Sequence, residues 1–436
     1  MALEHMARAG EEGTRAASAR TPPAGPIGLY VHVPFCQTKC PYCDFNTYAR
    51  IERLMPGYTD ALCAELGLWG EALGRPAVRT VFFGGGTPSY LPVELLGRIL
   101  GAVGAAFAVE EGAEVTVEAN PGDLDLASLG ALRALGVDRL SIGVQSFDDH
   151  FLRALGRRHS AAQAEEAYRL ARRAGFRRVN LDLMFGLPEQ SLEDWAATLE
   201  RALALAPPHL SLYCLTLEPG TPLERWVREG RVPQPDPDLA AELYALAEER
   251  LEAAGYHHYE ISNWALPGEE CRHNLIYWRN EAYLGVGAGA HSSLGGYRFH
   301  DTLSPRSYIE RVRRWAAVGA RRLETLDAAT LAGLGPVEGV EAISRDLEMA
   351  ETVFLGLRLL DGLELEVFRR RFGVGLRERY GPQVAELEEL GLLEEVPPGG
   401  HGAAPAAGTG CPSGGVLRLT RRGHLLANQV FLRFLE

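Results

Sequence analysis

The 436-residue sequence predicts an α/β protein, in which a partial (β/α)6 barrel is followed by a winged-helix-like α+β domain. From Ile27 to about Gly255, short apolar and β-branched runs alternate with amphipathic segments at a spacing of roughly 30 residues. Such alternation indicates βαβ units and a parallel sheet, and six units are too few for a closed eight-stranded barrel. From Glu351 onwards the pattern changes to helices, two short strands and a closing helix.

The barrel elements follow from the hydrophobic periodicity of the first 255 residues. The predicted strands begin at Gly28, Arg79, Glu114, Arg139, Val179 and His209. The predicted helices between and after them span residues 56–69, 92–107, 161–174, 192–206 and 239–254. In barrels of this kind the chemistry lies at the carboxyl ends of the strands, so polar residues there are the first candidates for a site.

Composition divides the chain further. Residues 1–26 mix acidic and basic side chains without an apolar stretch, which predicts a disordered tail rather than a signal peptide. Residues 27–255 are the predicted barrel, 256–345 a less regular connecting region and 346–436 the C-terminal domain. In that domain, strands are predicted from Leu392 and Val416 and a helix over 421–435, whereas the low-complexity segment 397–415, which contains Cys411, is predicted to be a mobile loop.

The charge and cysteine content restrict the class of protein. A net charge of −13 gives no electrostatic support for binding nucleic acid, so the winged helix is interpreted as a structural or docking module. No run of eighteen apolar residues is present, so no transmembrane segment is expected. An odd count of 7 cysteines without an export signal predicts a reducing compartment, the cytoplasm, and a metal site rather than disulfides.

Three cysteines lie close together after the first strand, in the sequence Cys36-Gln-Thr-Lys-Cys40-Pro-Tyr-Cys43. Three thiolates on one loop can hold three irons of a [4Fe–4S] cubane and leave the fourth iron open. The alternative is a zinc site, which needs four protein ligands, with His32 as the fourth. The other cysteines of the barrel and connecting region, Cys63, Cys214 and Cys271, are predicted to be small buried residues.

The spacing C-x3-C-x2-C, with an aromatic residue before the last cysteine, resembles the signature of the radical S-adenosylmethionine superfamily. The surrounding sequence YVHVPFCQTKCPYCDFNTY is similar to the branch that contains oxygen-independent coproporphyrinogen oxidases and HemW haem chaperones. The resemblance covers most of the chain and implies a [4Fe–4S] cluster on Cys36, Cys40 and Cys43, with S-adenosylmethionine on its open iron. The segment from Ala328 to Arg345 departs from the family and looks like an insertion.

The second strand leads into Gly84-Gly85-Gly86-Thr87-Pro88, where missing side chains allow close approach of a ligand to the backbone. No Gly-Lys-Ser/Thr follows, so this is not a phosphate-binding P-loop. In this family, such a loop binds the methionine amino group of the cosubstrate, which implies roles for Gly85, Gly86 and Thr87.

The next three strands carry Glu118, Gln145 and Asp182 at or near their carboxyl ends, where apolar residues are expected. Buried polar groups need partners, so either a ligand or an internal hydrogen-bond network must satisfy them. The family resemblance implies that they line the S-adenosylmethionine site. It also implies that Arg157 meets the ligand carboxylate and that Tyr30 and Tyr42 contact the cosubstrate beside the cluster.

Two features separate a haem chaperone from a coproporphyrinogen oxidase. The oxidase motif continues to a fourth cysteine, and Phe45 stands at that position here. In addition, His273-Asn-Leu-Ile-Tyr277-Trp278 matches the H-N-x-x-Y-W motif of the HemW group. A neutral imidazole is a common haem ligand and aromatic rings suit a porphyrin face, although a hydrogen-bonded structural histidine is the alternative.

The resemblance therefore favours a protein that binds haem and transfers it to an acceptor protein not identified by the sequence. A flavodoxin or ferredoxin is the kind of electron donor that this chemistry uses. Cys271 and His291 are weaker candidates for contact with haem. The run Gly285-x-Gly287-x-Gly289 lacks the strand–turn–helix context of a dinucleotide site and is interpreted as close backbone packing near the pocket.

Overall fold

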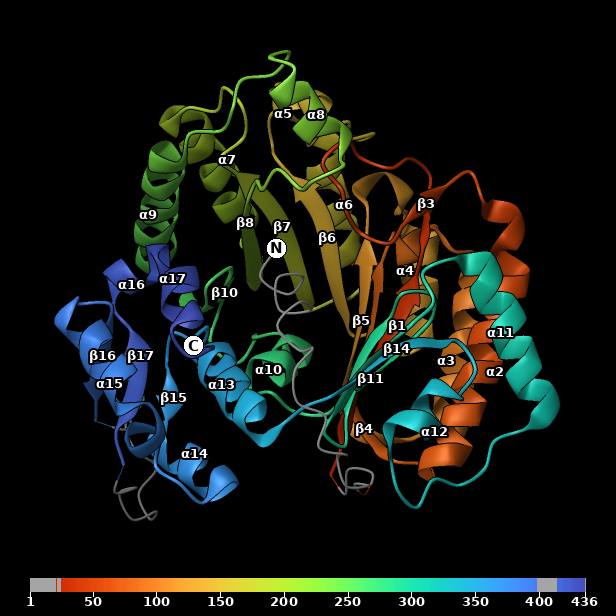
Figure 1. Cartoon of the computed structure of the whole chain (residues 1–436). Helices are drawn as coiled ribbons and strands as arrows, with labels where there is room; N and C mark the ends of the chain where they lie inside the picture. The colour runs from red at the N-terminus through yellow and green to blue at the C-terminus, as the bar shows by residue number, and fades with distance from the viewer. Residues whose placement is uncertain (1–20, 22–24, 398–413, 436) are drawn as a thin grey trace.

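The computed structural model describes residues 21, 25–397 and 414–435. The predicted tail and the predicted loop with Cys411 therefore lie mostly outside the described residues. A 12-stranded mixed sheet dominates the structure, and a 3-stranded sheet belongs to the C-terminal part (Figure 1). Two-residue strands β2 (Phe35–Cys36) and β3 (Tyr48–Ala49) form a separate parallel pair.

The six predicted barrel strands are confirmed. They lie side by side in chain order and are all parallel. Their interior residues are buried, because helices cover one face and the curved sheet encloses the other. The strands are β1 (Ile27–Val33), β4 (Ala77–Gly85), β5 (Ala108–Ala119), β6 (Arg139–Gln145), β7 (Arg178–Phe185) and β8 (His209–Cys214).

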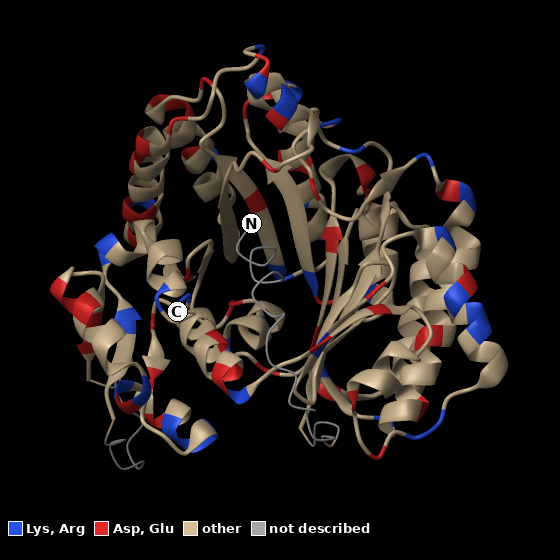
Figure 2. Cartoon of the chain, in the orientation of Figure 1, with Lys and Arg blue, Asp and Glu red and all other residues tan. Residues whose placement is uncertain are grey.

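The helices of the barrel pack on its outer face (Figure 1). Serine N-caps begin two of them, where Ser160 and Ser191 accept backbone N–H bonds from Gln163 and Asp194. Most charged side chains lie on these helices and on loops, whereas the strands are largely uncharged (Figure 2). The helices are α2 (Met55–Leu73), α3 (Val93–Ala106), α4 (Leu126–Ala134), α5 (Asp149–Ala154), α6 (Ala161–Arg173), α7 (Leu192–Leu205), α8 (Pro222–Arg228) and α9 (Pro237–Ala253).

The connecting region extends the sheet at both edges. At one edge β11 runs parallel to β1 and is followed by three antiparallel strands, and at the other edge β10 and β9 pair beside β8. The predicted insertion, Ala328–Arg345, supplies the edge strand β14. The elements are β9 (His257–Glu260), β10 (Asn263–Ala265), α10 (Arg272–Trp278), β11 (Tyr283–Val286), β12 (His291–Leu294), β13 (Tyr297–Asp301), α11 (Pro305–Val318), α12 (Ala328–Ala332) and β14 (Val337–Ala342).

The C-terminal part has its own hydrophobic core between helices and a small antiparallel sheet in the order β15–β17–β16. The two predicted strands are confirmed, and β15 is an additional one. The closing helix predicted over 421–435 is wrong in one respect, because Leu426 is not helical (φ −112°, ψ 17°) and divides it in two. The elements are α13 (Arg345–Gly356), β15 (Leu363–Glu364), α14 (Leu365–Phe372), α15 (Leu376–Glu389), β16 (Leu393–Val396), β17 (Val416–Leu419), α16 (Arg421–Leu425) and α17 (Ala427–Leu432).

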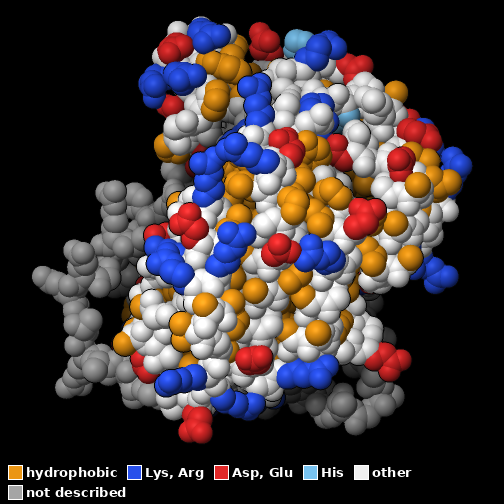
Figure 3. Space-filling view, turned by 90° about the vertical axis from the view of Figure 1, so that its right-hand side faces the viewer, with side chains coloured by type: hydrophobic (Ala, Val, Ile, Leu, Met, Phe, Trp, Pro, Cys, Tyr) orange, Lys and Arg blue, Asp and Glu red, His pale blue; other side chains and the backbone are white. Residues whose placement is uncertain are grey.

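Figure 3 shows one face of the outer surface. On the side that carries α2 and α11, hydrophobic side chains are interspersed with arginine and acidic residues (Figure 3). Among the described residues, no helix combines the length and the apolar character that crossing a membrane requires.

Candidate functional site

The three predicted cluster ligands lie on the loop that leaves the carboxyl end of β1. Thr47 Oγ1 donates a hydrogen bond to Cys36 Sγ at 3.0 Å, and Thr87 Oγ1 lies 3.3 Å from the same sulfur. The backbone N–H of Cys43 donates to the carbonyl oxygen of Cys40 at 3.2 Å, which turns the loop back on itself. All three thiols are free and partly accessible, so the loop presents them for a metal group at the mouth of the barrel.

The loop geometry fits a polynuclear cluster better than a single zinc ion. Around one tetrahedral zinc, with Zn–S bonds of about 2.3 Å, the sulfurs would lie about 3.8 Å apart. Among the described residues, the three cysteine sulfur atoms do not all lie within 4.8 Å of one another. The proposed fourth zinc ligand is also occupied, because His32 Nε2 bonds Asn46 O at 2.9 Å and Nδ1 bonds Tyr30 Oη at 3.0 Å.

The glycine run closes tightly against this loop. A Cβ on Gly85, whose φ is +107°, would lie 2.3 Å from the His32 ring, and one on Gly86 would lie 2.8 Å from Phe35 O. Gly84 faces inward, where a Cβ would lie 3.2 Å from Glu118 Oε2. The run therefore brings bare backbone to the base of the cysteine loop and close to Glu118.

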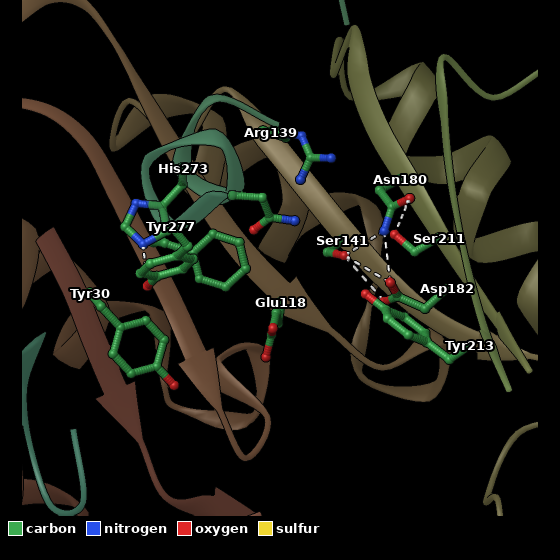
Figure 4. A pocket seen from close by; sticks show the side chains of 12 residues that line it. Tyr30, Glu118, Arg139, Ser141, Asn180, Asp182, Ser211, Tyr213, His273 and Tyr277 are labelled. Carbon is green, nitrogen blue, oxygen red and sulfur yellow. Dashed lines mark hydrogen bonds between the residues drawn. The ribbon is translucent and has the colours of Figure 1, made fainter. Parts of the chain in front are cut away.

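A cavity of about 190 Å³ lies inside the barrel (Figure 4). Three of the predicted cosubstrate residues line it, namely Tyr30, Glu118 and Asp182. Most of the other lining residues were not predicted from the sequence, although Asn180 and Asp182 alternate on one face of β7 as polar residues in an apolar strand. The remaining lining residues are Phe82, Arg139, Ser141, Asn180, Ser211, Tyr213, His273, Asn274 and Tyr277.

Two acidic side chains, Glu118 and Asp182, face this cavity, and their surroundings differ. Burial, together with the charge of Asp182, raises the pKa of Glu118 to about 8. Asp182 was predicted at or near the carboxyl end of its strand. This prediction is wrong, because Asp182 lies in the middle of β7. There it accepts hydrogen bonds from Ser141 Oγ at 3.1 Å and Asn180 Nδ2 at 2.8 Å. Asp182 thus belongs to an internal network, whereas Glu118 is a buried acid suited to a cationic group.

Arg157, Gln145 and Tyr42 lie beside Cys40 rather than on the wall of this cavity. Arg157 Nη1 donates to Cys40 Sγ at 3.6 Å, and Nη2 donates to Asn120 Oδ1 and to Gly143 O. The Nε of Arg157 is buried without a hydrogen-bond partner. A buried guanidinium N–H without an acceptor is suited to a carboxylate ligand. Gln145 has a left-handed backbone (φ 68°) at the end of β6 and places its amide next to the same arginine.

The helix α10, which contains His273, closes the amino end of the barrel (Figure 1). Glu114 of β5 anchors it by accepting the backbone N–H bonds of Arg272 at 3.2 Å and His273 at 3.0 Å. His273 is 1% exposed, and its ring bonds Thr80 Oγ1 through Nδ1 and Tyr277 Oη through Nε2, both at 2.8 Å. Burial, with a contribution from Arg139, lowers the pKa of His273 to about 4, so the imidazole is neutral.

The weaker candidates have other surroundings. Cys271 is buried and donates its thiol to Glu114 Oε1 at 3.6 Å, and His291 is exposed on β12. The prediction of buried cysteines is wrong for Cys214, which is exposed at the end of β8. The Gly285–Gly289 run packs closely, as predicted, since a Cβ on Gly287 (φ +104°) would lie 2.7 Å from His32 O.

The residues present therefore fit the two groups that the resemblance implies. Three free thiols face the end of the barrel, and beside them lie a bare glycine backbone, an unpartnered guanidinium N–H and a buried acid. An amino acid with a positively charged sulfonium can use all of these donors and acceptors.

Comparison with known proteins shows which proteins this chain is similar to. A family model described as the Radical SAM superfamily matches residues 30–202, and one described as the HemN C-terminal domain matches residues 343–396. The E. coli coproporphyrinogen III oxidase HemN, described as a radical SAM enzyme, has the same fold, with a TM-score of 0.76 over 94% of this chain and 90% of that chain at 24% identity. The fold is thus shared with that enzyme, and the cysteine loop lies within the residues that match the Radical SAM model.

Relatives with higher sequence identity narrow the class of protein to which the chain belongs. Proteins named heme chaperone HemW are 40% identical in Mycobacterium tuberculosis, over 94% of both chains, and 35% identical in Bacillus subtilis, over 93% of this chain and 98% of the relative. The Escherichia coli HemW is 44% identical over 62% of this chain and 70% of its own length. The chain belongs to the HemW family.

Proposed function

We propose that this protein is a haem chaperone, which binds haem and transfers it to an acceptor protein in the cytoplasm. The supporting observation is the 40% identity over 94% of the chain to relatives named heme chaperones. Two residues agree with it: Phe45 stands where the oxidase pattern has its fourth cysteine, and His273 begins the HemW-type motif on α10. Phe45 is 64% exposed beside the cysteine loop, so no fourth thiol is available there.

We further propose that Cys36, Cys40 and Cys43 hold a [4Fe–4S] cluster that binds S-adenosylmethionine. When bound, the two groups supply one-electron reductive cleavage of the cosubstrate, for which a flavodoxin or ferredoxin is a suitable electron donor. The chain's own residues bind and orient the ligand. The proposed contacts are the Gly85-Gly86-Thr87 backbone, Glu118 and Tyr30 within the barrel, Asp182 through its network, and Arg157, Gln145 and Tyr42 beside Cys40.

Arg157 gives a direct test of the cosubstrate site. In cluster-loaded protein, Arg157→Ala should weaken S-adenosylmethionine binding by about 1.5–3 kcal/mol, roughly ten- to a hundredfold, because a charge-assisted hydrogen bond is lost. Equilibrium dialysis measures this, with Arg153→Ala, an exposed arginine of α5, as the control. Unchanged affinity together with a lowered melting temperature would instead assign Arg157 to the fold.

Binding of haem at His273 would require a change in the structure. The 190 Å³ cavity is smaller than the roughly 300–1,000 Å³ of ordinary ligand pockets, so it does not enclose a porphyrin as it stands. Both nitrogens of His273 are also bonded. We therefore propose that His273 reaches haem only when its bond with Tyr277 or Thr80 is released, which requires movement at α10.

Haem titration followed by the Soret band tests this proposal. His273→Ala should weaken binding by about tenfold or more, or change the ligation, because an axial ligand is lost. His150→Ala, on the surface helix α5, is the control, and His291→Ala tests the weaker candidate. In parallel, reduced protein is given coproporphyrinogen and S-adenosylmethionine without oxygen. Sustained formation of protoporphyrinogen over many turnovers would overturn the chaperone proposal in favour of the oxidase.

A further inference from the structure

A second group of potential metal ligands lies far from the cysteine loop, where the barrel meets the C-terminal part. Glu248 comes from α9, His258 from β9 and His424 from α16, and one ligand atom of each lies within 4.8 Å of the other two. His424 Nδ1 lies 3.1 Å and His258 Nδ1 lies 3.5 Å from the same oxygen, Glu248 Oε1. The neighbouring elements α9 and β9 and the distant helix α16 thus direct ligand atoms at one point.

The orientation of His258 is fixed by its surroundings. Its ring stacks on Trp264, with centroids 3.9 Å apart and planes 11° from parallel. Its Nε2 faces the Ile261 carbonyl oxygen at 3.3 Å, while Tyr244 Oη donates its own proton to that carbonyl at 2.8 Å. Nε2 thus points to the Ile261 carbonyl oxygen, and Nδ1 points to Glu248. Metal-bound histidines are commonly held in this way, with the second nitrogen on a backbone carbonyl.

The three ligand atoms converge on one point, where a single cation can contact all of them. Two acceptor atoms 3.5 Å apart repel each other unless a proton or a metal ion lies between them.

The donor set indicates the kind of ion. Two imidazole nitrogens and one carboxylate are typical ligands of Zn²⁺, with water in the fourth position, whereas Mg²⁺ and Ca²⁺ prefer oxygen ligands alone. Arg421 Nε also approaches Glu248, but at the other oxygen, Oε2, at 3.2 Å. Its side chain is 69% exposed, so it can turn towards solvent when a cation binds. His424 would ligate through Nδ1, the nitrogen that faces Glu248.

We propose that Glu248, His258 and His424 form a binding site for a divalent transition-metal ion of the zinc type, which joins α9 and β9 of the barrel side to α16 of the C-terminal part. A metal bound there adds a link between α16 and the α9–β9 segment, beside the ion pairs that Glu248 makes with His424 and Arg421. This site is separate from the cysteine loop and does not depend on the proposed haem function.

The test uses full-length protein whose cysteine loop is already loaded with iron and sulfide, so that the thiols do not take up the probe. The protein is dialysed with Zn²⁺ in the presence of a weak chelator, and bound zinc is quantified. Wild type should retain about one zinc per chain, and Glu248→Gln and His424→Ala should each lose it. His257→Gln is the matched control, because His257 is adjacent on β9 and pairs instead with Asp361 at 3.2 Å.

A spectroscopic measurement on the wild type covers the case in which a variant fails to fold. Co²⁺ in place of Zn²⁺ should give the visible absorption of a tetrahedral nitrogen and oxygen site without a thiolate charge-transfer band. Equal zinc retention by wild type and folded His424→Ala would overturn the proposal. So would a wild-type cobalt spectrum that shows thiolate ligation alone.

Discussion

Replacement of any one of Cys36, Cys40 and Cys43 by Ala is expected to abolish the iron–sulfur cluster. The wild-type protein, reconstituted without oxygen, should be brown and contain about four irons per chain, since three thiolates hold a cubane of that size. Each sulfur serves a different iron, so the loss of one ligand leaves two that cannot hold the cluster. The broad charge-transfer absorption and the iron and sulfide content, measured together, report the result.

Cys63→Ala and Cys214→Ala are the controls for this experiment. Cys63 is half-buried on α2, with its thiol 3.6 Å from Arg98 O, and Cys214 is exposed at the end of β8. Both variants should keep the full absorption and iron content. Stoichiometric zinc without labile sulfide in the wild type would contradict the cluster, and an equal loss in Cys63→Ala would contradict the assignment of ligands.

Glu114→Gln is expected to lower the free energy of unfolding by about 3–5 kcal/mol, because it breaks a buried ion pair from one side. Glu114 is completely buried, and its Oε2 lies 2.9 Å from Arg178 Nη2. The same carboxylate accepts the backbone N–H groups that begin α10. Its loss removes the acidic partner nearest to Arg178, whose other partners, Asp138 and Glu269, lie 3.6 Å and 3.5 Å away, and it weakens the anchor of α10. Urea unfolding of both proteins measures the difference, with Glu110→Gln, exposed on the same strand, as the control.

The pH dependence of that difference has a definite sign. Burial alone would raise the pKa of Glu114, but the charges of Arg139 and Arg178 outweigh it and hold the pKa below its ordinary value. A lowered pKa stabilises the folded state above the unfolded-state pKa of about 4.3, and this contribution is lost as the pH falls towards the folded pKa. The gap between wild type and Glu114→Gln should therefore be full at pH 7 and shrink below about pH 4. A gap that grows on acidification would contradict the ion-pair explanation.

The sequence predicted the parts of the fold that depend on local pattern. Each βαβ unit carries its own periodicity, so all six barrel strands and the principal helices were found. The edge strands β9 to β14 were not, because they have three to six residues each and owe their pairing to distant neighbours. The C-terminal strand pair was predictable, while β15, with only two residues, was not.

The site was predictable to the same degree. Glu118 stood out as a polar residue in an apolar strand and Tyr30 was implied by the family resemblance, and the structure brings both to one cavity. The hydrogen-bond state of His273 was beyond sequence reasoning, since one of its partners, Thr80, is 193 positions away. Arg139 was also missed, because an arginine that begins a strand ordinarily lies in solvent, whereas here it is 2% exposed.

The pairing of β1 has a consequence for the order of events during synthesis. One edge of β1 is completed by β4, but the other is completed by β11, which begins at Tyr283. The loop after β1 is tied down still later, since Asn46 Nδ2 donates to Ala288 O at 2.8 Å and to Leu303 O at 3.0 Å. At roughly 5–20 residues per second, a ribosome needs on the order of 13–50 s to proceed from the cysteine loop to Leu303. During that interval the cysteine loop follows a strand with one unpaired edge, so insertion of the proposed cluster into its finished site must follow translation of about seven-tenths of the protein.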